Sequence, residues 1–144
     1  MASSRFAELV GKFLQHGATA SGFNKVTRNC RILSAESGKV QVEMEVPEEY
    51  TNPMGTLHGG IAASLIDTLA MATLYGAREG AGVTVSLNMT YLSVAPVGET
   101  ILINTELIKQ GKSLAFLTGD IRRKKDGVIA ATATQTIAVN NNKL

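Results

Sequence analysis

Hydrophobic and polar residues alternate over residues 40–46, VQVEMEV, and again over residues 83–91, VTVSLNMTY. Successive side chains of a β-strand point to opposite faces, so this period of two predicts two strands that each have one apolar face. In the first strand, the apolar face is formed by Val40, Val42, Met44 and Val46, and the face toward water by Gln41, Glu43 and Glu45. In the second, it is formed by Val83, Val85, Leu87, Met89 and Tyr91, opposite Thr84, Ser86, Asn88 and Thr90. Because a wet strand face normally carries Lys or Glu, this second, uncharged polar face predicts an interface or a ligand groove.

Other segments carry strand and turn signals. Residues 101–110, 113–121 and 128–139 predict three further strands, joined as hairpins at Gly111-Lys112 and Asp126-Gly127. Residues 25–33 predict a short strand that ends before a turn at Ser37-Gly38. The last four strands follow one another without intervening helices, which predicts a meander.

Two segments have helical patterns. Residues 1–24 begin with serines suited to an N-cap and predict an amphipathic helix, whose apolar face is formed by Phe6, Leu9, Val10, Phe13 and Leu14. The segment after Gly59-Gly60, IAASLIDTLAMATLYGAR, is apolar on nearly every side, which is typical of a central, buried helix. The one acid in this segment is Asp67. On a helix we expect it to lie among small and apolar neighbours, namely Gly60, Ala63, Ala70, Met71 and Leu74. Desolvation at such a place would raise the pKa of Asp67 toward the range of a general base.

This order of elements predicts an α+β fold, with an antiparallel sheet curled around one long helix. The 144 residues suit a single domain, with an N-terminal helix in residues 1–24 and the core in residues 25–144. A sheet of this kind keeps an exposed edge and face, so we expect dimerisation.

Composition narrows the possible functions. Lys and Arg number 14 against 12 acids, a balance that does not favour a nucleic-acid binder. The single cysteine, Cys30, cannot close an intramolecular disulfide, and no Cys/His cluster has metal-ligand spacing. The central helix is the one segment long and apolar enough to suggest a membrane span, but its acid, Asp67, and its glycines favour a buried helix instead. The run 122–125 most resembles a solvated turn, although it could also steer a phosphorylated substrate, and Lys124 and Lys125 are given no role. The first helix could also act as a weak mitochondrial targeting segment, so cytosol and mitochondrion both stay open.

Three segments carry a resemblance over almost the whole chain beyond the first twenty or so residues: TNPMGTLHGGIAASLIDTLA, GVTVSLNMTYLSVAPVGE and KQGKSLAF. They resemble the hotdog-fold acyl-CoA thioesterases of the thioesterase superfamily member 2 (acyl-CoA thioesterase 13) group, which are related to the bacterial phenylacetyl-CoA thioesterases. The resemblance implies hydrolysis of medium- or long-chain acyl-CoA in a homo-oligomer, with a dimer of dimers favoured. It implies no cofactor, since coenzyme A belongs to the substrate.

The resemblance also implies a role for individual residues. Asp67 would act as base or nucleophile, Asn52 and Gly59 would polarise the thioester carbonyl, and His58 would support the loop before the helix. Thr84 stands where family members commonly have a serine that helps to hold the water. Coenzyme A contacts fall on Thr84 and Ser86, on Tyr91, Leu92, Ser93, Val94, Ala95 and Pro96, and on Lys109, Gln110, Gly111, Lys112, Ser113 and Leu114.

Thioester hydrolysis needs a base for water and donors for the oxygen that becomes negative. Gly59, at the start of the long helix, can offer a backbone N–H backed by the helix dipole. Asp67 lies eight residues later, about 12 Å along the axis, so the two groups cannot easily serve one carbonyl from the same helix. The resemblance implies that they meet across a dimer interface.

Simpler structural roles are available for most of these residues. His58 could cap the loop structurally, Gly59-Gly60 could permit close packing at a helix start, Asn52 could be an ordinary turn residue, and residues 109–112 could be a polar hairpin tip. The main alternative to an enzyme is a module that binds acyl-CoA without turnover or acts through a protein partner. A dehydratase or isomerase on the same fold would need a different acid and a catalytic histidine. The sequence leaves the acyl chain length and the choice between dimer and tetramer open.

Overall fold

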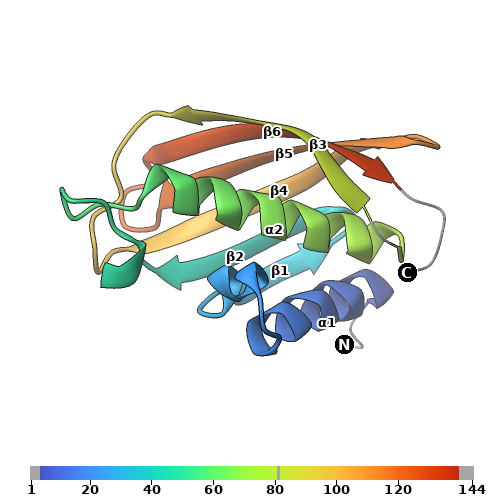
Figure 1. Ribbon diagram of the computed structural model, residues 1–144, viewed down its shortest axis with the longest axis horizontal. Helices are drawn as coiled ribbons and strands as arrows, with labels where there is room; N and C mark the ends of the chain where they lie inside the picture. Colours follow the sequence, from blue (N-terminus) through green and yellow to red (C-terminus); the bar gives the residue numbers. More distant parts are fainter. Residues whose placement is uncertain (1–3, 81, 140–144) are drawn as a thin grey trace.

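The computed structural model describes residues 4–80 and 82–139, and its six strands form one antiparallel sheet that curls around a long helix (Figure 1). In chain order the elements are α1 (Arg5–Thr19), the 3-10 turn η1 (Phe23–Thr27), β1 (Arg31–Glu36), β2 (Lys39–Glu45), the 3-10 turn η2 (Glu48–Tyr50), α2 (Gly59–Ala77), β3 (Gly82–Tyr91), β4 (Thr100–Gln110), β5 (Leu114–Arg123) and β6 (Ile129–Val139). The strand order is β1-β2-β4-β5-β6-β3. The predicted α+β class is therefore confirmed.

The β1–β2 hairpin follows the sequence pattern closely. Ser37 and Gly38 have φ angles of 51° and 77°, so both turn residues are left-handed, as the tight turn of a two-residue hairpin requires. The predicted apolar face of β2 is buried, since none of its four residues is more than 2% exposed. Glu43 is an exception on the other face: it is also buried, and its carboxylate pairs with Arg31 and with Lys124, the latter at 2.6 Å. The prediction that Glu43 faces water was wrong, and Lys124 has a structural role.

Two predictions about strand order and position were also wrong. β3 pairs with β6, at the far edge of the sheet, and β4 pairs with β2, so the last four strands are no simple meander. The reason is that α2 carries the chain across the sheet from β2 to the opposite edge. Residues 25–27 form part of η1 in place of a strand, because the Thr27 hydroxyl donates to the Asn24 carbonyl and the Tyr50 hydroxyl donates to the Val26 carbonyl. The strand begins only at Arg31.

β3 contains a bulge that breaks its alternation. Thr84 pairs with Ile137, and Ser86 pairs with Thr136, so two steps along β3 match one step along β6 and Val85 is the extra residue. Thr84 therefore faces α2 while Val83 and Val85 are 68% and 60% exposed. The prediction that Val83 and Val85 share a face with Leu87 and Met89 was wrong for this reason.

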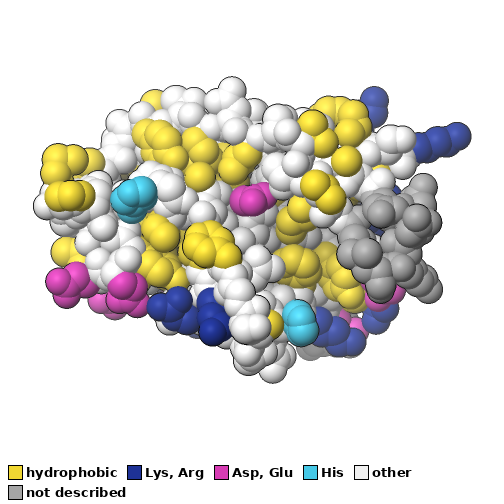
Figure 2. Space-filling model, viewed as in Figure 1, with side chains coloured by type: hydrophobic (Ala, Val, Ile, Leu, Met, Phe, Trp, Pro, Cys, Tyr) yellow, Lys and Arg dark blue, Asp and Glu magenta, His cyan; other side chains and the backbone are white. Residues whose placement is uncertain are grey.

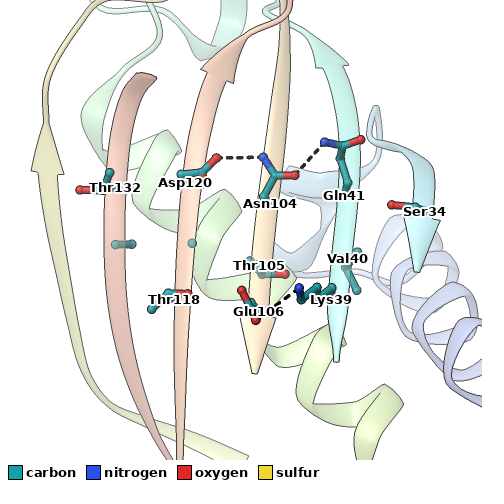
Figure 3. Close-up of a pocket in the computed structure, with 12 residues that line it drawn as sticks. Ser34, Lys39, Val40, Gln41, Asn104, Thr105, Glu106, Thr118, Asp120 and Thr132 are labelled. Carbon is teal, nitrogen blue, oxygen red and sulfur yellow. Dashed lines mark hydrogen bonds and ion pairs between the residues drawn. The ribbon is translucent and has the colours of Figure 1, made fainter. Parts of the chain in front are cut away.

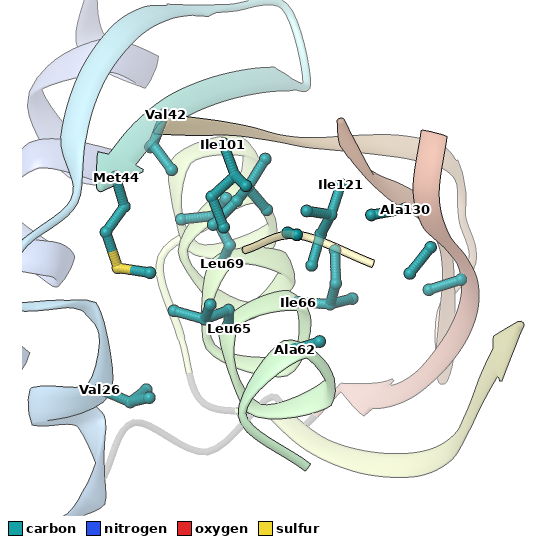
Figure 4. Close-up of a cluster of buried hydrophobic side chains, with 14 of the residues drawn as sticks. Val26, Val42, Met44, Ala62, Leu65, Ile66, Leu69, Ile101, Ile121 and Ala130 are labelled. Atoms are coloured by element: carbon teal, nitrogen blue, oxygen red, sulfur yellow. The ribbon is translucent and has the colours of Figure 1, made fainter. Parts of the chain in front are cut away.

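The core lies between α2 and the sheet. Leu65, Ile66 and Leu69 of α2 point toward Val42, Ile101 and Ile121 of the strands (Figure 4), and all six are at most 1% exposed. By length and composition α2 is apolar enough to cross a membrane, but more than half of that span is buried within this fold.

α1 packs against the C-terminal part of α2 (Figure 1). Its N-cap is Ser4, whose hydroxyl accepts from the Ala7 N–H at 3.1 Å, as the serines before the helix predicted. The two helices approach closely at Gly76, where an added Cβ would lie 2.7 Å from Val10 and 2.9 Å from Phe6. The absence of a side chain at Gly76 thus lets α1 cover this end of α2.

Candidate functional site

Asp67 is half-buried on α2 and is held by two neutral donors. The Thr84 hydroxyl donates to Asp67 Oδ1 at 2.8 Å, and the Gln135 amide donates to the same oxygen at 2.7 Å. Gln135 Nε2 also lies 3.0 Å from Thr84 Oγ1, which closes a triangle of polar groups from α2, β3 and β6. Among the described residues, Asp67 Oδ2 accepts no hydrogen bond. Met71 and Leu74, two of the predicted apolar neighbours, line a cavity together with Asp67, and the two polar donors leave the carboxylate with one oriented oxygen and one available oxygen.

Gln135 is the site residue that the sequence reasoning missed. It is 3% exposed, and its Oε1 has no hydrogen-bond partner within the described part of the chain. The alternation in β6 could have predicted that Gln135 points inward, because Ala131, Ala133 and Ile137, which lie on the same face of the strand, are buried. A glutamine in a row of inward-facing apolar residues needs a polar partner, and Asp67 supplies it.

The start of α2 is built around His58 and Gly59. His58 is the N-cap, and its Nδ1 accepts from the Gly60 N–H at 2.9 Å, so this nitrogen carries no proton. The first helical bond runs from the Ala62 N–H to the His58 carbonyl, which leaves the Gly59 N–H outside the helix ladder. Tyr91 lies over Gly59: its hydroxyl donates to the Gly59 carbonyl at 2.6 Å, and an added Cβ would lie 3.3 Å from its ring.

Asn52 organises the loop that precedes the helix. Its Oδ1 accepts from the backbone N–H groups of Met54 and Thr56, and its Nδ2 donates to Thr56 Oγ1 at 2.8 Å. Gly55, with φ 76°, completes the turn. One Nδ2 hydrogen is left over for a ligand, so this geometry allows the carbonyl-polarising role as well as the structural one.

The predicted coenzyme A contacts fall into separate groups. Residues 91–96 follow β3 at the N-terminal end of α2, where Leu57 donates to the Ala95 carbonyl, and residues 109–114 form the β4–β5 hairpin at the opposite end of the sheet (Figure 1). Ala95 is only 2% exposed, and Ser86 lies on the other face of β3 from Thr84 because of the bulge. One subunit therefore does not bring these groups together around Asp67.

A cavity of about 370 Å³ lies beside the carboxylate, lined by Phe13, Asn24, Asp67, Thr68, Met71, Leu74, Tyr75, Gly80 and Gly82. Figure 2 views the face that carries α2, where hydrophobic side chains spread around an acidic group near the centre and most charged groups lie toward the margins.

A larger hollow of about 540 Å³ lies on the outer face of the sheet, away from Asp67. Its floor is a row of side chains on neighbouring strands, in which Gln41 donates to Asn104 and Asn104 donates to Asp120, both at 2.8 Å (Figure 3). The two acids that line this hollow are ion-paired, Asp120 with Arg122 and Glu106 with Lys39. Asp67, in the smaller cavity, has only neutral partners among the described residues, and its second oxygen is available for chemistry. The smaller cavity is therefore the candidate site.

Other reactive groups are less suitable. Burial raises the pKa of the Cys30 thiol to about 12, so Cys30 is no nucleophile at neutral pH. Within residues 4–80 and 82–139, no three His, Cys, Asp or Glu side chains are close enough together to hold a metal ion.

Comparisons with known proteins agree with this arrangement. Residues 54–130 match the family model of the thioesterase superfamily. Human acyl-coenzyme A thioesterase 13 is 43% identical over 123 residues, which cover 85% of this chain and 88% of the human protein. The crystal structure of zebrafish thioesterase superfamily member 2 is 36% identical, with a TM-score of 0.87 over 96% of this chain and 100% of that one. A Streptococcus mutans structure bound to acetyl-CoA is 26% identical, with a TM-score of 0.73 over 81% of this chain and 92% of that one.

These likenesses confirm the hotdog fold and the family that the sequence motifs indicated. The chain belongs to the thioesterase superfamily.

Proposed function

We propose that this protein hydrolyses medium- or long-chain acyl-CoA to the free acid and coenzyme A, with Asp67 as the base that activates water. The observation that carries the proposal is the state of the Asp67 carboxylate: Thr84 and Gln135 hold Oδ1, and Oδ2 faces no donor among the described residues. A carboxylate with one oriented oxygen and one available oxygen is suited to accept a proton from a bound water. Similarity to acyl-coenzyme A thioesterase 13 supports the same substrate class.

The reaction follows from these groups. Asp67 Oδ2 takes a proton as the water oxygen attacks the thioester carbonyl, and the carbonyl oxygen becomes negative. The Gly59 N–H, at the positive end of the α2 dipole, stabilises that charge. Collapse of the tetrahedral intermediate breaks the C–S bond, and the thiolate of coenzyme A leaves and takes the proton that Asp67 accepted, which restores the carboxylate. No cofactor enters this scheme, because water is the nucleophile.

Two subunits are needed to complete the site. Gly59 and Asp67 are separated by about 12 Å along α2, too far to act on one carbonyl. β3 is an edge strand, and a two-fold axis near its middle would pair it antiparallel with its copy. That pairing lays the Tyr91 end of one strand beside the Gly82 end of the other. Since Tyr91 contacts Gly59 and Thr84 contacts Asp67, Gly59 of the partner subunit would approach Asp67.

The same pairing explains the separated coenzyme A contacts. Residues 91–96 of one subunit and residues 109–114 of the other would lie toward the same end of the dimer, because the two subunits run in opposite directions. Lys109 and Lys112 are exposed cations suited to the phosphates of the nucleotide. We propose that dimers of this kind associate further into a dimer of dimers.

The test is a thiol-release assay with decanoyl-CoA on the wild-type protein and on Asp67→Asn. The asparagine keeps the size and polarity of the side chain but cannot accept the proton, so kcat should fall by roughly 10²–10⁴-fold while substrate binding is largely kept. Asp126→Asn, in the exposed β5–β6 turn, is the matched control and should keep wild-type turnover. Binding without thiol release by the wild-type protein would instead indicate a binding module, and a product other than the free acid would indicate a dehydratase or isomerase.

A further inference from the structure

A second cavity adjoins the one that contains Asp67. It measures about 300 Å³ and is lined by Lys12, Phe13, His16, Gly17, Asn24 and Tyr75. Phe13, Asn24 and Tyr75 line both cavities, so the two are neighbouring sections of one groove between α1, α2 and the η1 segment. The groove begins at the carboxylate and ends beside the polar side chains of Lys12 and His16.

The wall of the groove on α2 follows one face of the helix. Asp67, Met71 and Tyr75 are four residues apart in succession, and each is half-buried, so they form one row along the groove. The row is about 12 Å long from Asp67 to Tyr75, because a helix rises 1.5 Å per residue. Beyond the acid, Met71, Leu74 and Tyr75 line the groove on α2 and Phe13 lines it on α1, with Asn24 as the polar side chain that both sections share.

Two aromatic rings stand where the two sections meet. The ring centres of Phe13 and Tyr75 are 5.6 Å apart, and the rings are tilted by 44°. Phe13 comes from α1 and Tyr75 from α2, so this pair narrows the groove at a fixed distance from the carboxylate. A chain in the first section stays within the site, and a longer chain must pass the pair to enter the second section.

We propose that this groove is the acyl-chain subsite, and that the Phe13–Tyr75 pair sets the chain length; the proposal rests on the thioesterase function proposed above. A fully extended chain advances about 1.2 Å per bond, since a residue of three backbone bonds spans 3.3–3.6 Å. The 12 Å between Asp67 and Tyr75 therefore holds roughly ten carbons. Saturated acyl groups of about this length fill the first section, and longer ones occupy the second section beyond the aromatic pair.

The test uses one substitution that closes the groove and one that opens it. Met71→Trp places a large ring one helical turn from the acid, and Phe13→Ala removes half of the aromatic pair. Each variant is assayed for kcat/KM with butanoyl-, decanoyl- and hexadecanoyl-CoA. Phe23→Ala is the control, because Phe23 is 68% exposed and lines neither cavity. The ratio between two substrates is read within one variant, so a partly unfolded preparation does not change it.

Each methylene removed from water contributes about a fourfold factor in affinity. Met71→Trp should therefore lower the decanoyl-to-butanoyl ratio by at least about tenfold, since it excludes two or more methylenes. Phe13→Ala should raise the hexadecanoyl-to-decanoyl ratio severalfold, and Phe23→Ala should leave both ratios unchanged.

Equal losses on all three substrates in Met71→Trp, or an unchanged chain-length profile in both groove variants, would overturn the acyl-chain assignment while leaving the thioesterase function intact. Failure of the wild-type protein to release thiol from any of the three substrates would instead overturn the proposed function.

Discussion

The backbone N–H of Gly59 makes no helical hydrogen bond, so proline can replace Gly59 at the cost of that N–H alone. Proline is favoured at the first position of a helix, and His58 before it has φ −64° and ψ 133°, a conformation that proline tolerates in its neighbour. We predict that Gly59→Pro lowers kcat by roughly 10²–10³-fold, the loss typical of one oxyanion donor. Gly59→Ala is the control: it keeps the N–H and places a similar Cβ against Tyr91. Steady-state kinetics on both variants measures the effect, and equal losses would assign it to contact with Tyr91.

Gln135 should matter for turnover more than for stability. Gln135→Met keeps the length of the side chain but removes the donor to Asp67, together with a buried oxygen that has no partner in the described structure. A hydrogen bond to a charged group contributes about 1.5–3 kcal/mol, so we predict a fall in kcat of roughly ten- to a hundredfold with KM little changed. Urea unfolding at fixed protein concentration should show a similar midpoint. A fall in stability that accounts for the lost activity would contradict the positioning role.

At the scale of single residues, sequence reasoning succeeded where a motif was local. The start of the long helix at Gly59 was predicted from the adjacent glycines and the apolar run after them, and α2 begins at that residue. The partners of Asp67 are 17 and 68 residues away, on strands whose pairing depends on the path of α2. The alternation in β6 could mark Gln135 as a buried polar residue, but no local pattern says that Asp67 is its partner.

At the scale of elements, α1 and α2 each contain a glycine, and replacing the two glycines by alanine should change the free energy of unfolding in opposite directions. An alanine in place of a helical glycine ordinarily stabilises a protein by about 0.5–1 kcal/mol. Gly11 on α1 has open space around its Cβ position, so Gly11→Ala should follow that rule. At Gly76 the added Cβ would meet Val10 and Phe6 at less than 3.0 Å, so Gly76→Ala should destabilise by about 1–3 kcal/mol. Urea unfolding of both variants tests the pair, and stabilisation by both would show that the helices separate at little cost.

The elements also show what a periodic pattern can predict. The alternation at residues 40–46 placed all four apolar side chains in the core, because β2 pairs regularly with β4 over residues 39–45, and it missed only the burial of Glu43. The alternation in β3 looked equally regular, but the bulge at Val85 reverses the faces on one side of it. The bulge turns Thr84 toward Asp67 and leaves Val83 and Val85 exposed at the sheet edge. The departure from the pattern thus occurs at the functional site and at the edge proposed for pairing.

At the scale of the whole molecule, the proposed division of each site between two subunits can be tested by mixing inactive variants. Asp67→Asn lacks the base and Gly59→Pro lacks the oxyanion donor, so each alone should be nearly inactive. If the two groups act across the interface, a mixed dimer has one intact site and one site with both defects. Denaturing and refolding the variants together in equal amounts should therefore restore about one quarter of wild-type activity, because half of the dimers are mixed.

Each variant refolded alone is the control and should stay inactive. Size-exclusion chromatography of both variants before and after mixing checks that the assembly is unchanged, and dilution without denaturation shows whether subunits exchange on the time scale of the assay. A mixture that contains mixed dimers but gains no activity would place Gly59 and Asp67 in the same subunit's site. Within one subunit, α2 separates Gly59 and Asp67 by about 12 Å. Such a result would therefore also show that the Gly59 N–H does not stabilise the oxyanion formed when the water activated by Asp67 attacks the carbonyl.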